Sequence, residues 1–96
     1  MSDEHLYMVV YDIRDPKRWR RIYRLMHGYG EWLQLSVFQC RLDRTRHAEL
    51  VADIDTAMAS EDHVVIIDVG PADKVAPKIV SLGEDYDPIE IGPTIV

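Results

Sequence analysis

Two short apolar segments at residues 6–13 and 62–69, and two helix-like stretches at 16–27 and 43–58, predict an α+β fold of two layers. The chain has 96 residues, and a chain of this length has no room for a second hydrophobic core. We therefore expect a single domain over residues 1–96, with residues 84–96 as a C-terminal tail or edge strand.

The first segment, residues 6–13, is rich in β-branched and aromatic side chains, which favours a buried strand with Asp12 at its end. Asp15 and Pro16 then predict a helix N-terminus, because aspartate caps free backbone N–H groups and proline suits the first helical turn. Gly28 and Gly30 are expected to end this helix. Its apolar side chains recur at helical spacing: Trp19, Ile22, Tyr23 and Met26.

Residues 31–42 are strand-like throughout, with a turn expected near Leu35 and Ser36. Asp43 predicts the cap of a second helix that runs to about residue 58. The face of this helix that we expect to meet the core carries His47, Leu50, Val51, Ile54, Ala57 and Met58. Residues 62–69 form a further strand closed by a Gly-Pro pair, and short edge strands are expected at 78–82 and 89–91.

This order of elements predicts a ferredoxin-like two-layer sandwich, in which two helices cover one face of an antiparallel sheet. Apolar residues point to both faces of the inner strands, as in the alternation of Val9 with Val10 and of Val64 with Val65. Two helices cover only one of these faces. An exposed apolar sheet face is unusual in a monomer, so we expect a twofold homodimer that packs sheet to sheet.

The charge is segregated along the chain. The net charge is −6, yet nine of the eleven Lys and Arg residues lie between Arg14 and Arg46, where only three acids occur. The first helix contains five bases and no acid from Lys17 to Arg24, although exposed helices usually mix charges. A solvated helix face is one interpretation and a nucleic-acid surface is the other. The candidate phosphate-binding residues are Arg14, Lys17, Arg18, Arg21 and Arg24.

Asp12 is the most informative acid because it ends an apolar strand directly before a helix. It is either a solvated strand end or a ligand of a hard divalent cation such as Mg²⁺, with a second copy of the chain supplying another carboxylate. Cys40 is the only cysteine, which excludes an internal disulfide and a multi-cysteine zinc site. The acidic N-terminus and the absence of an apolar run of roughly 18 residues favour a cytoplasmic protein with no membrane partner.

Several motifs occur in one consistent order. Val9-Val10-Tyr11-Asp12-Ile13 precedes the basic helix, Tyr29-Gly30 follows it, and then come Gln34-x-Ser36-Val37-Phe38, Glu61-Asp62 and Gly70-Pro71. Together they resemble the second CRISPR-associated protein family, Cas two. Where that family often has an arginine before its Gln-x-Ser-Val-Phe element, this chain has Trp32.

The resemblance implies a ferredoxin-like homodimer with metal-dependent endonuclease activity on single-stranded RNA or double-stranded DNA. It also implies a place in spacer acquisition beside the CRISPR integrase, Cas one. Carried onto this chain, it makes Asp12 the ligand of Mg²⁺ or another divalent cation. The other residues it places at the catalytic site are Tyr11, Ser36 and Phe38.

Three functions remain open at this stage. The first is a nuclease in which Asp12 holds the metal and the bases of the first helix position the nucleic-acid backbone. The second is a non-catalytic adapter dimer that holds duplex DNA for the integrase. The third is a small regulatory domain that binds a metabolite at a dimer interface, which the clustered bases disfavour.

Overall fold

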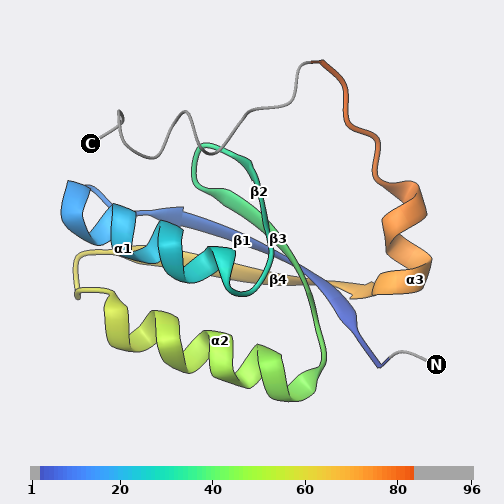
Figure 1. The fold of residues 1–96 in the computed structure, drawn as a ribbon, viewed down its shortest axis with the longest axis horizontal. Coiled ribbons are helices and arrows are strands. Elements are labelled where there is room, and N and C mark those ends of the chain that lie inside the picture. Colours follow the sequence, from blue (N-terminus) through green and yellow to red (C-terminus); the bar gives the residue numbers. More distant parts are fainter. Residues whose placement is uncertain (1–2, 84–96) are drawn as a thin grey trace.

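Four strands form one antiparallel sheet in the order β2-β3-β1-β4, and two helices lie side by side over one of its faces (Figure 1). The computed structural model describes residues 3–83. The strands are β1 (His5–Asp12), β2 (Glu31–Gln34), β3 (Val37–Leu42) and β4 (His63–Pro71). The helices of this layer are α1 (Pro16–His27) and α2 (Arg44–Ala57). The predicted ferredoxin-like α+β arrangement is confirmed.

Both helices begin at the aspartates that the sequence indicated. The Asp15 carboxylate accepts the backbone N–H of Arg18 at 2.9 Å, and the Asp43 carboxylate accepts that of Arg46 at 2.8 Å. Each carboxylate satisfies an N–H group that has no partner within its helix. The end of α1 at Gly28 is also confirmed.

The core lies between the sheet and the helix layer. Its fully buried side chains are Val9, Phe38 and Cys40 from the sheet and Ile22, Met26 and Leu50 from the helices. The predicted apolar face of α2 is wrong at Val51, which is 43% exposed. Val51 lies about 100° around the helix from Leu50, so it points away from the sheet that Leu50 and Ile54 contact.

A tight turn joins β2 to β3 at the predicted place. Leu35 has a φ of 43°, in the left-handed region, and its carbonyl oxygen accepts the Trp32 indole N–H at 2.9 Å. Before β2, Gly30 passes so close to β3 that an added Cβ would lie 2.2 Å from the carbonyl oxygen of Gln39. Glycine is therefore required there.

The segment after β4 differs from the prediction. Strand β4 pairs with β1 through Pro71 instead of ending at residue 69, because a register shift at Leu6 and Tyr7 lets the pairing continue past Gly70. The chain then forms a short helix, α3 (Ala72–Val75), and a 3₁₀ turn (Ala76–Lys78).

The predicted strand at 78–82 is wrong. Pro77 favours the turn, and residues 79–82 are exposed with no strand partner in the described chain. The predicted strand at 89–91 and the tail at 84–96 lie outside the described residues.

The sheet face opposite α1 and α2 carries exposed apolar side chains. The register places Val10 beside Val65 and Met8 beside Ile67 on this face. Val10 is 39% exposed, Val65 38% and Ile67 48%. The expectation of an apolar face that the two helices leave uncovered is confirmed for the described residues.

Candidate functional site

Asp12 is the last residue of β1 and pairs with His63, the first residue of β4. Its carboxylate is exposed and forms no hydrogen bond or ion pair with another side chain among residues 3–83. It borders an open hollow of about 710 Å³, which we call the Asp12 hollow. The residues that line it are Asp12, Arg14, Asp15, Pro16, Arg18, Glu61 and Asp62.

A metal ion in this hollow would find too few ligands among the described residues of one chain. The described residues contain no cluster of three or more His, Cys, Asp or Glu side chains placed to hold a metal. Mg²⁺ is nevertheless commonly held by one or two carboxylates, with water and substrate phosphates completing its shell. The carboxylate of Asp12 fits one such ligand, and a cation bound there would take its other ligands from water, a second chain or a nucleic acid.

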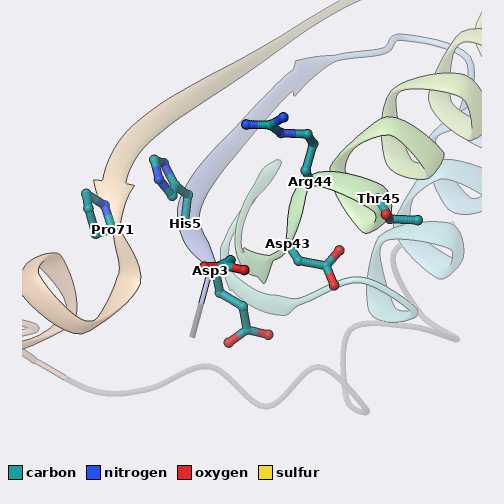
Figure 2. A pocket seen from close by; sticks show the side chains of 7 residues that line it. Asp3, His5, Asp43, Arg44, Thr45 and Pro71 are labelled. Atoms are coloured by element: carbon teal, nitrogen blue, oxygen red, sulfur yellow. The ribbon is translucent and has the colours of Figure 1, made fainter. Parts of the chain in front are cut away.

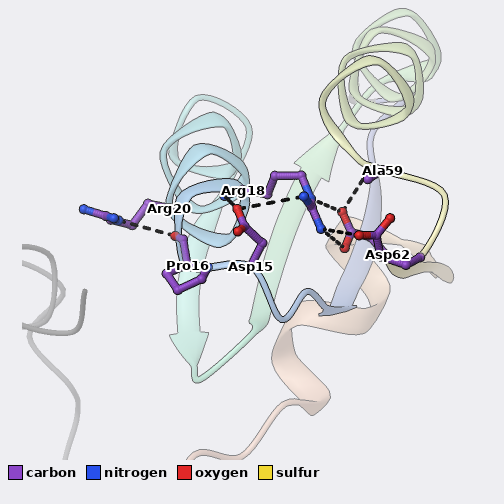
Figure 3. A network of polar contacts seen from close by, with 7 residues as sticks. Asp15, Pro16, Arg18, Arg20, Ala59 and Asp62 are labelled. Carbon is purple, nitrogen blue, oxygen red and sulfur yellow. Dashed lines mark hydrogen bonds and ion pairs between the residues drawn. The ribbon is translucent and has the colours of Figure 1, made fainter.

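Arg18 closes one side of the Asp12 hollow through ion pairs with acids from another part of the chain (Figure 3). Its Nε and Nη2 atoms donate to the two oxygens of Asp62 at 2.8 and 3.2 Å, and Nη2 also donates to Glu61 at 3.2 Å. The hydrogen bond from Arg18 holds the pKa of Asp62 below its usual range, with the Ala59 backbone N–H as the second cause.

A second hollow, of about 410 Å³, lies along α1 and is lined by four bases. We call it the basic groove: Lys17, Arg20, Arg21 and Arg24. Lys17, Arg21 and Arg24 have no ion pair in the described part of the chain, and Arg20 donates only to the Pro16 carbonyl at 3.4 Å. Four cations without acids to neutralise them make a surface suited to phosphate groups.

Three of the five predicted phosphate-binding residues line the basic groove. Lys17, Arg21 and Arg24 lie together in it, whereas Arg14 and Arg18 lie at the Asp12 hollow. Arg20 was not among the candidates. Its spacing could have identified it, because positions 17, 20, 21 and 24 follow the i, i+3, i+4, i+7 pattern of one helix face.

Tyr11, Ser36 and Phe38 come together, but on the helix side of the sheet. Tyr11 is 4% exposed and its ring stacks near Phe38, at 6.3 Å between centroids. Ser36 accepts the Trp19 indole N–H at 2.9 Å, and its carbonyl oxygen accepts the Tyr11 backbone N–H at 3.1 Å. Because neighbouring residues of a strand point to opposite faces, the Tyr11 hydroxyl and the Asp12 carboxylate point apart.

Burial also determines the acidity of two core groups. Desolvation raises the pKa of the Tyr11 hydroxyl, with the nearby Tyr23 as a smaller cause. It also raises the pKa of the Cys40 thiol to about 11, so this buried cysteine stays protonated at neutral pH. Neither group is poised to act as a base or a nucleophile.

The hollow at the opposite end of β1 is similar in size, at about 730 Å³ (Figure 2). Side chains of both charges line it: Arg44 is a base, whereas Asp3, Glu4 and Asp43 are acids. The His5 ring Nδ1 lies 2.9 Å from an Asp68 oxygen. This mixture does not single out an anion or a metal ion, so the Asp12 hollow and the basic groove are the stronger candidates.

A family model for CRISPR associated protein Cas2 matches residues 5–75, most of the described chain. The chain belongs to this family. A Cas2 from Geobacter sulfurreducens, named CRISPR-associated endoribonuclease Cas2, is 58% identical over 87 residues, which are 90% of this chain and 92% of that protein. A relative from Rhodospirillum rubrum, named CRISPR-associated endoribonuclease Cas2 1, is 48% identical over 91% of this chain and 86% of its own length.

Solved structures share the fold. A crystal structure described as cas2 superposes with a TM-score of 0.72 at 26% identity, covering 88% of this chain and 93% of its own. The Thermus thermophilus protein TT1823 gives a TM-score of 0.72 at 31% identity over 86% of this chain and 95% of its own. The family resemblance that the motifs indicated is confirmed. Among the described helices, none has the length and apolarity to cross a membrane.

Proposed function

We propose that this Cas2 chain is a CRISPR-associated endoribonuclease that uses Asp12 to bind a divalent cation. The observation that carries the proposal is an exposed carboxylate at the end of β1 that has no partner among residues 3–83, in a chain 58% identical to a relative named as an endoribonuclease. The expected cation is Mg²⁺. RNA is the proposed substrate because the relatives' names specify it, and double-stranded DNA is the alternative.

Residues in the Asp12 hollow and in the basic groove would have different roles in cleavage. When bound, the cation supplies Lewis-acid polarisation of a phosphodiester and lowers the pKa of water. Asp12 would hold it, and Arg14 in the same hollow lies where a phosphate could pair with it. The basic groove would hold neighbouring phosphates of the strand and so fix its register.

A second copy of the chain would complete the metal site. Asp12 lies on the same sheet face as Val10, two residues earlier, because alternate residues of a strand share a face. Packing of two such faces would cover Val10, Val65 and Ile67 and bring a second Asp12 to the same interface. In the proposed homodimer, the contact that buries the apolar face would therefore also bring the two Asp12 carboxylates to one interface.

We propose that such a dimer acts in spacer acquisition beside the Cas one integrase, as the family resemblance implies. A cytoplasmic location remains a prediction, as do these partners. The adapter function, in which the dimer holds duplex DNA without cleaving it, is the alternative outcome of the test below.

The test is cleavage by purified wild-type protein, Asp12→Asn and the control Asp55→Asn, which changes an exposed α2 carboxylate. Asparagine keeps the shape of the aspartate side chain but loses the charge that attracts a cation. We expect RNA cleavage by Asp12→Asn to fall by about a hundredfold or more, and that of the control to stay unchanged.

Nucleic-acid binding should survive in both variants, because the basic groove is intact. Full cleavage by Asp12→Asn would refute the proposed role of Asp12. Binding of DNA by the wild type with no cleavage of RNA or DNA would favour the adapter.

A further inference from the structure

Arg18 differs from the other bases of α1 in having its charge already paired. The bases of the basic groove have no ion pair among residues 3–83, whereas Arg18 contacts Asp62, Glu61 and, at 3.9 Å, Asp15. Its side chain is 23% exposed and that of Asp62 is 1% exposed. A guanidinium that holds a buried carboxylate by two hydrogen bonds is poorly placed to bind phosphate as well.

Asp62 carries two connections at once. The oxygen that accepts the Arg18 Nε–H also accepts the backbone N–H of Ala59 at 2.8 Å. The carboxylate thereby fixes the loop between α2 and β4 while it holds α1. At the other end of the network, the backbone N–H of Arg18 is bound by Asp15, the N-cap of α1 (Figure 3).

This network surrounds the segment that carries Asp12. The strand partner of Asp12 is His63, which directly follows Asp62. On the other side, Asp12 is followed by the loop that leads to Asp15 and the first turn of α1. Arg18 therefore joins the two chain segments that border the Asp12 hollow, one through its backbone and the other through its side chain.

We propose that Arg18 is a positioning residue, which fixes the Asp12 hollow by tying the start of α1 to Asp62, and that it does not contact the nucleic-acid backbone. The inference rests on the proposed nuclease function and deepens it. It divides the bases of α1 into those that bind phosphate, in the basic groove, and one that shapes the site where cleavage takes place.

The test compares Arg18→Met with Arg21→Met, which removes a base of the same helix that has no ion pair among the described residues. Binding of single-stranded RNA is measured over a range of salt concentrations, at a temperature where circular dichroism shows every variant folded. Loss of one phosphate contact lowers the slope of log affinity against log salt by about 0.7. We expect this fall for Arg21→Met and an unchanged slope for Arg18→Met.

The cleavage kinetics provide the second measurement. Arg18→Met should lower kcat by roughly tenfold with little change in KM, because a misplaced catalytic group slows the reaction without weakening binding. Arg21→Met should chiefly raise KM. Asp62→Asn should reproduce the fall in kcat, and the double variant should be no slower than either single one, since both changes break the same contact.

Arg18→Met leaves a buried carboxylate without its partner, so its melting temperature should fall by roughly 10 °C. If that variant does not fold, Arg18→Lys takes its place, because lysine keeps the charge and loses the two-pronged geometry. A fall in the salt slope equal to that of Arg21→Met, or an unchanged kcat, would overturn the inference alone. A wild-type protein that neither binds nor cleaves RNA would overturn the proposed function, and the inference with it.

Discussion

Tyr11 carries a hydroxyl that is buried and has no hydrogen-bond partner among the described residues. Its ring contributes to the core beside Trp19 and Phe38. A buried polar group without a partner costs stability, because it loses its hydrogen bonds to water and gains none in the protein. The aromatic ring is therefore useful to the fold, whereas the hydroxyl opposes it.

Replacing Tyr11 by phenylalanine should raise the free energy of unfolding by about 1 kcal/mol, since only the unpaired hydroxyl is removed. Chemical denaturation of the two proteins measures this, with Tyr7→Phe as a matched control at another buried tyrosine of β1. A lower denaturation midpoint for Tyr11→Phe would mean that the hydroxyl has a hydrogen-bond partner in solution, and it would contradict this prediction.

The sequence predicts the role of a residue where that role depends on its near neighbours along the chain. Asp15 and Asp43 were identified as caps because the residues that they bind follow within three positions. The ion pair of Arg18 with Asp62 joins residues 44 positions apart, and no periodicity reveals such a pair. The sequence therefore grouped Arg18 with the free bases of α1, and only the structure separates it from them.

Helix α1 has two chemically different faces. Its apolar side packs on the sheet through Ile22, Tyr23 and Met26, and the basic groove lies on another side. The four bases of the groove repel one another in the free protein, and a bound polyanion relieves that repulsion. The groove should therefore bind RNA and DNA without regard to sequence, and this binding should depend strongly on salt.

Changing both Lys17 and Arg24 to glutamine should remove two phosphate contacts and lower the salt slope of RNA binding by about 1.4. The fold should be unaffected, because both side chains are exposed and have no ion pair in the described chain. Fluorescence anisotropy over a salt series measures the slope. Arg44→Gln, which changes an exposed base of α2, is the control, and an equal effect there would indicate nonspecific attraction to the whole protein.

The elements that the sequence predicted well are those whose apolar periodicity is strong or whose ends carry caps. The segment after β4 lacks both features. Val80 and Leu82 suggested a strand there, yet they are 79% and 89% exposed, because the residues around Pro77 turn away from the sheet. Strand propensity without a neighbouring edge to pair with does not make a strand.

For the whole molecule, the arrangement of apolar and charged side chains on its separate faces says more about what it binds than the net charge of −6 does. One sheet face packs against the two helices, and the other presents Val10, Val65 and Ile67 with Asp12 at its end. Alternation along the strands predicted both faces correctly. Alternation alone does not identify what covers the second face, since residues of one chain that become buried in a dimer have the same pattern as core residues. The expectation of a homodimer came from the number of helices, because two helices cover only one face.

Dimer formation through this face can be tested by changing Val65 and Ile67 to glutamate together. Two charges in the middle of an apolar contact would have to lose their hydration, so the variant should be monomeric at concentrations where the wild type is a dimer. Analytical ultracentrifugation gives the mass. The control is Val51→Glu, because Val51 is similarly exposed at 43% but lies on α2, away from the proposed interface.

The same variant tests whether the proposed metal site is shared between two chains. If each site needs an Asp12 from both copies, the monomeric variant should lose cleavage by about as much as Asp12→Asn, although its own Asp12 and basic groove are unchanged. RNA cleavage at matched protein concentrations measures this loss. A monomer that cleaves at the wild-type rate would show that one carboxylate is sufficient, and a variant that remains dimeric would show that the chains meet through another surface.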